Sequence, residues 1–376
     1  LISLSSVLFA QQSTFNFMRL SGEGVTLRHG SYDNPRAMVG QSAHELLTRS
    51  ALTSLTDERT GDLLNILPDA ETDTVFQLGD TLVSGYSYGL PNTATGIYPS
   101  NVIDYVFDVD ETNSLLLLNF AVVFEDPGGH TTNHKPLFGV KISDINDNTL
   151  DPCTEYEVYA LEGNAGFETY QYYRMDYVNN EWQNVLHTVR WRDWTAIGLD
   201  LSPYIGGAVK VSFTTKDCYD GSHYAYTYFT AKCVNNSLAA QCIDDDHVTL
   251  AAPLGFETYT WSGAGGNAST ATYDIPDNGL RVTCHLESFT GCECDLMAYI
   301  VRYNVTPGTH ILYDTTCISQ PYTYSHYDIP TSDLMLGDNV FVNTIVEAGD
   351  CNNVATSILQ LYVVDALEKH VYADVC

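Results

Sequence analysis

Apolar residues recur at every second position over much of this chain, and this period limits the fold more than any other feature. Residues 103–109 are a clear case, because Ile103, Tyr105 and Phe107 share one face of an extended strand. Stretches with a helical period are scarce, and only residues 43–52 predict one short helix. The chain is therefore expected to be all-β.

One strand is expected to be buried on both faces. Residues 114–124 are nearly all apolar, and Asp126, Pro127 and Gly128 then end the run sharply. Further strands are expected at residues 139–145, 155–161, 193–201, 209–215 and 224–231.

The length of 376 residues exceeds what one hydrophobic core comfortably serves, so two or three domains are expected. The texture of the sequence changes after Cys233, where a short linker precedes a new set of strands spaced about ten residues apart. The expected arrangement is tandem β-sandwiches. Their bounds are residues 13–233 for the first sandwich, 240–302 for a small Ig-like domain and 303–376 for a second one.

The first twelve residues form a separate apolar segment with two interpretations. One is the remnant of a signal peptide, because a small residue precedes Gln11. The other is an assembly strand that inserts into a neighbouring subunit. Its apolar residues are Leu1, Ile2, Leu4, Val7, Leu8 and Phe9. No apolar run approaches the roughly 20 residues of a membrane span.

The formal net charge is −31, from 47 acidic and 16 basic residues. Such a surface repels nucleic acid and anionic membranes, so both are rejected as partners. It keeps a secreted protein soluble and offers oxygen ligands for Ca²⁺. The 26 Tyr residues suit half-buried strands, or alternatively an aromatic contact surface for glycans or protein partners.

The ten Cys residues begin only at Cys153, and they lack the paired spacing of a zinc site. Their even number favours disulfides in an oxidising, extracellular setting. Sequence alone leaves the connectivity open. The pairings expected from strand position are Cys242 with Cys284, Cys317 with Cys351 and Cys153 with Cys218.

Residues 192–233, which begin Arg-Asp-Trp-Thr and end at a Cys, resemble a module of large cell-surface and secreted proteins of the Bacteroidetes. These proteins include gliding-type adhesins and type IX secretion cargo. Residues 248–261 resemble the start of a PKD- or Ig-like repeat from the same proteins. The resemblance implies a jelly roll over residues 13–233, followed by PKD/Ig-like modules, in adhesins or filaments. No catalytic residues come with it.

Calcium is the expected cofactor, if the chain has one. Asp144, Asn146 and Asp147 gather oxygen ligands on one loop, although an ordinary hairpin turn would explain the same residues. Asp217 and Asp220 form a second candidate, for which a loop held by a disulfide is the alternative.

Three Thr residues lie directly after an Asp, in sequences that resemble the Asp-Ser/Thr-apolar pattern of O-glycosylation sites in the Bacteroidetes. They are Thr74, Thr81 and Thr315.

Motifs of the common enzyme classes are absent from the sequence. His44 and Glu45 begin like a zinc-protease motif, but Thr48 stands where the second His is required. The many acidic residues make any single carboxylate pair uninformative about glycoside hydrolysis. The chain is therefore expected to be non-enzymatic.

These features favour a structural or adhesive module of an extracellular surface protein or filament. Its expected partners are copies of itself or other surface proteins, with glycans as a further class. A carbohydrate-binding module is the first alternative, with a sugar platform built from Trp182, Trp191, Trp194 and Trp261. A secreted hydrolase is the second alternative.

Overall fold

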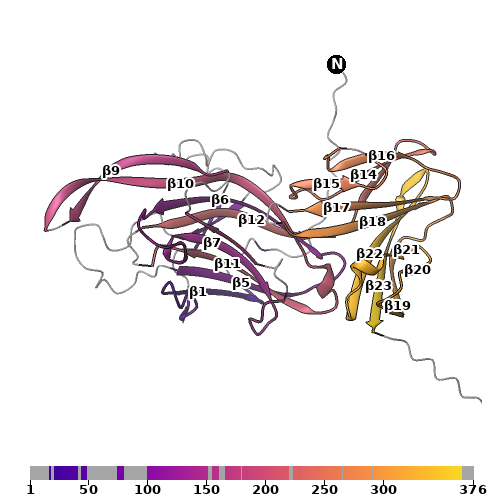
Figure 1. Cartoon of the computed structure of the whole chain (residues 1–376), viewed down its shortest axis with the longest axis horizontal. Coiled ribbons are helices and arrows are strands. Elements are labelled where there is room, and N and C mark those ends of the chain that lie inside the picture. Colours follow the sequence, from indigo (N-terminus) through magenta and orange to yellow (C-terminus); the bar gives the residue numbers. More distant parts are fainter. Residues whose placement is uncertain are drawn as a thin grey trace, which may run out of the picture.

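The fold was obtained as a computed structural model, which describes residues 17, 21–40, 44–48, 74–79, 100–150, 155–160, 166–178, 180–219, 223–264, 266–288 and 291–365. Strands dominate these residues, and they form two bodies along the long axis of the molecule (Figure 1). The all-β class is confirmed. Within the described ranges, helical structure is limited to the short 3-10 turns η2 (Thr132–His134), η4 (Ser202–Tyr204) and η5 (Thr331–Asp333). Among the described residues, no helix has the length and apolar character needed to cross a membrane.

The first body is a sandwich of two six-stranded sheets. In spatial order, one sheet contains β2 (Met38–Val39), β1 (Val25–Gly30), β5 (Ser100–Asp108), β11 (Ala208–Lys216), β7 (Leu137–Ser143) and β8 (Glu155–Tyr159). The other contains β3 (His44–Thr48), β4 (Thr74–Gly79), β12 (Ala225–Val234), β6 (Leu115–Asp126), β10 (Glu181–Asp200) and β9 (Glu168–Val178). The interleaved orders β4-β12-β6-β10 and β5-β11-β7-β8 are those of a jelly roll, as expected.

The helix expected at residues 43–52 was wrong. His44–Thr48 is strand β3, which pairs antiparallel with β4 so that Leu46 lies opposite Phe76. Pairing with a neighbouring strand overrides a local helical period in so short a segment.

Strand β6 is buried on both faces, as its apolar sequence predicted. Phe120, Val122 and Phe124 face the core between the two sheets. Ala121 and Val123 point the other way, into a second apolar cluster on the outer face of the sheet. All five side chains are fully buried. A strand with no solvent face has no use for alternating polar residues, which explains the continuous apolar run.

Aromatic rings join the two sheets across the core of the jelly roll. Phe213 of β11 and Phe229 of β12 stack with their ring centroids 4.5 Å apart. Phe138 of β7 lies 6.1 Å from Phe229. All three rings are fully buried, so they contribute both apolar burial and aromatic contact to the sandwich.

The second body is built on another six-stranded sheet. In spatial order it contains β15 (Thr258–Trp261), β17 (Leu280–Glu287), β18 (Glu293–Val301), β22 (Gly337–Glu347), β23 (Asp350–Val364) and β19 (Gly308–Cys317). A three-stranded sheet packs on one part of it, and a small hairpin packs on another part. The small sheet contains β13 (Ala239–Cys242), β14 (His247–Ala251) and β16 (Thr270–Asp274), and the hairpin contains β20 (Tyr322–Tyr324) and β21 (Tyr327–Ile329).

This sheet crosses the domain boundary that was expected between residues 302 and 303. Strands β18 and β22 pair in parallel, with Tyr299 opposite Ile345. The backbone edge of β18 is thereby satisfied by a strand from the following segment. The expectation of two separate Ig-like domains therefore needs correction, because strands from both expected domains belong to one six-stranded sheet.

The disulfide pairings expected from sequence were also wrong. Cys242 is bonded to Cys351, with 5.4 Å between the Cα atoms, and Cys292 is disulfide-bonded too. Cys284, the expected partner of Cys242, is a buried thiol on β17 and lies directly opposite Trp261 of β15. Cys317 remains a thiol, 3.1 Å from Ser319 Oγ. The order of strands in space brings β13 beside the start of β23, and this order cannot be read from strand positions in the sequence.

The third expected pairing, Cys153 with Cys218, is contradicted at Cys218, which is the one of the two that the structure describes. Cys218 remains a buried thiol, with its Sγ atom 3.3 Å from His223 Nδ1. Cys153 lies outside the described residues.

We predict that replacing both Cys242 and Cys351 by Ser lowers the free energy of unfolding of the second body by about 2–5 kcal/mol, because the bond closes a long loop. Urea denaturation under oxidising conditions measures this change. Cys317→Ser, which removes a thiol outside this bond, is the control. Equal midpoints for the double variant and the unmodified chain would contradict the disulfide.

The two bodies meet closely at Gly198 of β10. Its N–H donates to the Gly255 carbonyl oxygen over 3.0 Å, and a Cβ atom added at Gly198 would lie 2.5 Å from the Phe256 ring. A second link runs from Thr309 Oγ1, which donates to Glu111 Oε1 over 2.9 Å. A side chain at position 198 would therefore push the two bodies apart.

Gly198→Ala is expected to destabilise the protein by about 1–3 kcal/mol, since the Phe256 ring must move to admit the methyl group. The loss appears as a lower midpoint in thermal unfolding followed by circular dichroism. Gly129→Ala is the matched control, because no atom lies closer than 3.9 Å to its added Cβ. A Gly198→Ala midpoint no lower than that of the control would contradict the close junction.

Candidate interaction arm

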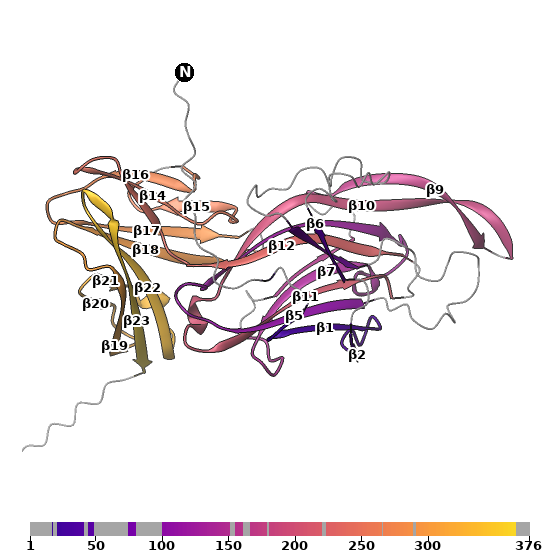
Figure 2. The ribbon, with the colours of Figure 1, turned by 180° about the vertical axis from the view of Figure 1, so that it is seen from behind.

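Strands β9 and β10 form a long antiparallel hairpin that projects from the jelly roll. The pairing of β10 with β6 ends where Thr188 lies opposite Asp126, and residues 181–187 pair only with β9 among the described strands. At about 3.4 Å per residue, this overhang is roughly 20 Å long. Figures 1 and 2 show it at the end of the molecule opposite the second body. We call β9 and residues 181–187 of β10 the arm.

One face of the arm carries large apolar side chains in solvent. Alternation along both strands places Tyr173, Met175, Trp182 and Leu186 on the same face, with Tyr173 directly opposite Leu186. These four side chains are between 47% and 66% exposed. We call this set the apolar stripe. Contiguous exposed apolar surface of this kind marks an interaction site on a soluble protein.

The apolar stripe continues the core-facing side of the jelly-roll sheet. Arg190 of β10 lies opposite Phe124, which points into the core, so Leu186 lies on that same side two alternations further out. Between the core and the stripe, Asp126 accepts from Lys135 Nζ over 2.7 Å and from Arg190 Nε over 2.6 Å. These ion pairs close the core, and beyond them no described strand of the opposite sheet covers this face.

The other face of the arm is anchored by a buried charged network. The Glu125 carboxylate at the end of β6 is fully buried, 2.6 Å from His187 Nδ1 and 3.1 Å from Arg174 Nη1. Asp176 Oδ2 lies 2.7 Å from His187 Nε2, and Arg174 Nε donates to Asp176 Oδ1 over 2.8 Å. Tyr172 also donates its hydroxyl to Glu125. The network holds the base of the arm rigidly on the sheet.

Both carboxylates of this network are held in the charged form. Burial alone would raise the pKa of Glu125, but the hydrogen bond from His187 and the charge of Arg174 hold that pKa below its ordinary value. Burial likewise opposes the charged form of Asp176, and Arg174 outweighs it, so the pKa of Asp176 is also lowered. A carboxylate kept charged in this way suits anchoring and does not suit donating a proton.

The arm and the next five residues of β10 together carry no net formal charge on a strongly acidic chain. The arm itself has a formal charge of −2, from Glu168, Asp176, Glu181 and Arg174, and Arg190 and Arg192 of β10 balance it. A partner of either sign therefore meets little repulsion at the arm, although the whole chain carries −31.

Close to the arm, a Cys and a His meet without forming an activated nucleophile. Cys218 is fully buried beside His223, and burial lowers the pKa of His223 to about 4. The imidazole is therefore neutral near pH 7 and cannot stabilise a thiolate as a charged partner.

In the loop expected to bind calcium, the polar side chains form hydrogen bonds and an ion pair within the protein. The Asp144 carboxylate accepts from the backbone N–H groups of Asn146 and Asn148 over 2.8 and 2.9 Å, which is the pattern of a turn. Asp147 pairs with Lys210 Nζ over 2.5 Å. Asp217 accepts from the Ala225 N–H over 2.7 Å. The described residues contain no group of three or more His, Cys, Asp or Glu side chains placed to hold a metal ion.

The remaining candidates from sequence are scattered. Thr315 is exposed on β19, Thr74 begins β4, and Thr81, Asp220 and the assembly strand at residues 1–9 lie outside the described residues. The four Trp residues do not share a surface. Trp261 is in the core of the second body, Trp191 and Trp194 pack against the outer cluster of the jelly roll, and Trp182 belongs to the arm.

Sequence reasoning assigned no strand to residues 168–192 and so missed the arm. A signal was available, because Tyr170 to Val178 is rich in Tyr and a turn follows at Asn180, which has a φ of 67°. Two strand-like runs joined through Asn residues predict a hairpin. What the pattern could not predict is that one face of this hairpin lies in solvent.

No protein-family model and no curated protein matches this chain. Among solved structures, the enzymatically active domain of bacteriophage CBA120 tailspike protein 4 matches with a TM-score of 0.26 and 11% identity, over 59% of this chain and 21% of that one. The glycoside hydrolase domain of Endo-D from Streptococcus pneumoniae R6 matches with a TM-score of 0.18 and 10% identity, over 60% and 33% of the two chains.

The adhesin domain of Epf from Streptococcus pyogenes matches with a TM-score of 0.14 and 8% identity, over 73% of this chain and 96% of that one. The present chain thus spans a third or less of the first two proteins. All three similarities are too low to carry an argument about function.

The anchoring network predicts a loss of stability in acid. The pKa of Glu125 in the folded protein lies below the ordinary value of 4.5, so its contribution is fully present above that value. It is lost as the pH falls through the lower folded-state pKa. Glu125→Gln removes the charge and is expected to cost about 1–3 kcal/mol at pH 7. Its stability should also fall less steeply than that of the unmodified chain as the pH falls below 4.5.

Urea denaturation across this pH range measures both effects. Glu168→Gln, at an exposed position on the same arm, is the matched control. Parallel pH curves for Glu125→Gln and the unmodified chain would show that the network does not hold Glu125 in its charged form.

Proposed function

We propose that this chain is a non-enzymatic structural or adhesive module of an extracellular surface protein or filament, and that the arm is its contact element. The observation that carries the proposal is the apolar stripe. Four large side chains, including Tyr173 and Trp182, stand in solvent on an otherwise acidic and soluble protein. Aromatic side chains of this kind supply most of the binding energy at protein interfaces.

The anchoring of the arm supports the same proposal. Because Glu125, His187 and Arg174 bond one face of the arm to the sheet, the apolar stripe is presented in one orientation. A contact surface that is rigid before binding loses little conformational entropy when a partner binds. The carboxylates of this network are charged and ion-paired, which suits anchoring and does not suit proton donation.

Two further features agree with an extracellular setting. The Cys242–Cys351 disulfide persists in oxidising compartments, and the strongly acidic surface keeps a secreted protein soluble. The resemblance of residues 192–233 to surface proteins of the Bacteroidetes fits the same setting. We include that relationship in the proposal.

Carbohydrate binding is the second candidate, and one observation favours it. Tyr173 and Trp182 lie on one face of the arm, where aromatic rings could stack on sugars. The same variants test both candidates, because binding to a purified glycan or to a protein-coated surface identifies the ligand class.

We expect Tyr173→Thr combined with Leu186→Thr to reduce retention of the labelled chain on intact cells of the producing organism by at least about tenfold, since two central anchors are lost. Thr keeps the strand propensity of both positions. Flow cytometry on cells incubated with labelled protein measures the retention, and a glycan array measures sugar binding.

Ile243→Thr combined with Leu254→Thr is the matched control, because it removes two equally exposed apolar side chains far from the arm. If the control loses as much retention as the arm variant, general surface hydrophobicity explains the binding, and the arm is not the contact element.

A further inference from the structure

A second exposed apolar face lies on the second body, around the edge strand β19. Ile311 and Tyr313 share one face of β19, and Tyr362 of β23 lies on the same face because it pairs with Thr315. These three side chains are between 51% and 69% exposed. The opposite face is covered, since Leu312 packs with Tyr322 and Tyr327 of the small hairpin.

This face borders a groove between the two bodies. The groove has a volume of about 690 Å³. The second body contributes Tyr313, Tyr362 and Val340, and the jelly roll contributes Pro203 and Ile205. Asp314 and Asp338 also line it, so its lining combines apolar and acidic residues. We call it the junction groove.

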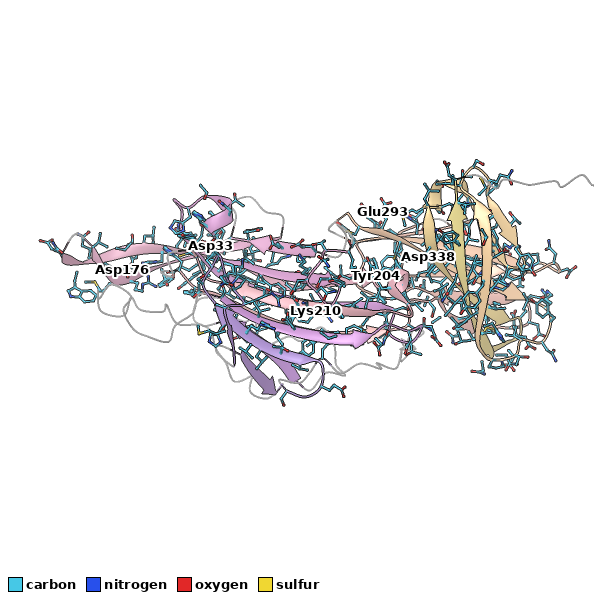
Figure 3. The ribbon with its side chains drawn as sticks, turned by 90° about the horizontal axis from the view of Figure 1, so that it is seen from below. Asp33, Asp176, Tyr204, Lys210, Glu293 and Asp338 are labelled. Atoms are coloured by element: carbon cyan, nitrogen blue, oxygen red, sulfur yellow. A yellow bond between two sulfur atoms is a disulfide. The ribbon has the colours of Figure 1, made fainter. Side chains whose placement is uncertain are left out.

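We propose that the apolar stripe of one copy packs into the junction groove of a second copy, head to tail. This inference rests on the proposed function, because it names the partner of the same arm. Figure 3 shows Asp176 on the arm at one end and Tyr204 and Asp338 beside the groove, with the length of the jelly roll between them. An arm therefore cannot reach the groove of its own chain.

The arm and the groove supply what each other lacks. Among the described strands, no second sheet covers the arm, and none covers the face around Tyr313. Packing two such faces forms the ordinary sheet-on-sheet contact of about 10 Å. A roughly 20 Å overhang is long enough to enter a neighbouring molecule.

Charge favours this pairing over groove-to-groove contact. Only three of the sixteen Lys and Arg residues lie after residue 233, against eighteen of the forty-seven acidic residues. Two acidic grooves would therefore repel, whereas the arm, whose formal charge of −2 is balanced by Arg190 and Arg192 at its base, would be repelled less. Gln171 and Asn184 lie on the same face as the apolar stripe, and their amides can donate to Asp338, which lies on the same face as Tyr362.

Contact between two arms is the main competitor, because symmetric dimers are common. It would bury the apolar stripe but leave Ile311, Tyr313 and Tyr362 in solvent. Head-to-tail packing buries both faces in one interface. Since the two faces differ and lie far apart, each added copy presents a new arm and a new groove, and the assembly grows as an open chain or closes as a ring.

Sedimentation velocity of the full chain over a concentration series tests the inference. The arm variant combines Tyr173→Thr with Leu186→Thr, and the groove variant combines Tyr313→Thr with Tyr362→Thr. We expect the unmodified chain to associate, and each variant alone to associate at least about tenfold more weakly. Ile243→Thr combined with Leu254→Thr, remote from both surfaces, should associate like the unmodified chain.

Mixing the two variants separates the possible geometries. The arm variant keeps an intact groove and the groove variant keeps an intact arm, so their mixture should form one-to-one dimers that do not grow. A groove variant that associates as strongly as the unmodified chain would overturn the inference in favour of contact between arms. A mixture that stays monomeric would overturn it as well.

The fate of the proposed function is read separately. If the unmodified chain remains monomeric at every concentration, the second copy is not the partner and this inference fails. Retention on cells that still requires the arm would then uphold the proposed function with a different partner. Loss of self-association in the arm variant without any change in cell retention would uphold this inference. It would also show that the arm does not contact the cell surface, and the proposed function would fail.

Discussion

Burial of β6 on both faces is the constraint on which the rest of this structure depends. Its inner face supplies Phe120 and Phe124 to the jelly-roll core, and its outer face supplies Val123 to the second cluster. Strands β10 and β12 take up its two edges. The last residues of the same strand, Glu125 and Asp126, then carry the ion pairs that end the core and anchor the arm.

The arm exists because one strand of the jelly roll is longer than the sandwich needs. Strand β10 extends past the end of β6, and β9 pairs with this extension. Where the opposite sheet ends, no described strand covers the core-facing side of this hairpin. Apolar side chains at Tyr173 and Leu186 would cost solubility there unless a partner covers them. The buried network of Glu125 and His187 keeps the surface in place, which a flexible loop would not do.

The two bodies differ in how well local patterns described them. In the jelly roll, strands β5, β6, β7, β8, β11 and β12 were predicted closely from their apolar patterns and turns, whereas β9 and most of β10 were missed. In the second body, strand spacing suggested two small sandwiches, yet β18 and β22 pair in parallel across the expected boundary. The Cys242–Cys351 bond joins positions 109 residues apart, a distance that no local pattern encodes.

The sequence by itself determined the all-β class, the double-sided burial of β6 and the acidic character, because side-chain period and charge are properties of short segments and of composition. The tertiary structure decided which cysteines pair, where one body ends and which apolar residues remain in solvent. Met175 and Phe124 are both apolar residues of strands. Only the relative lengths of β6 and β10, set by long-range pairing, place one in the core and the other on the arm.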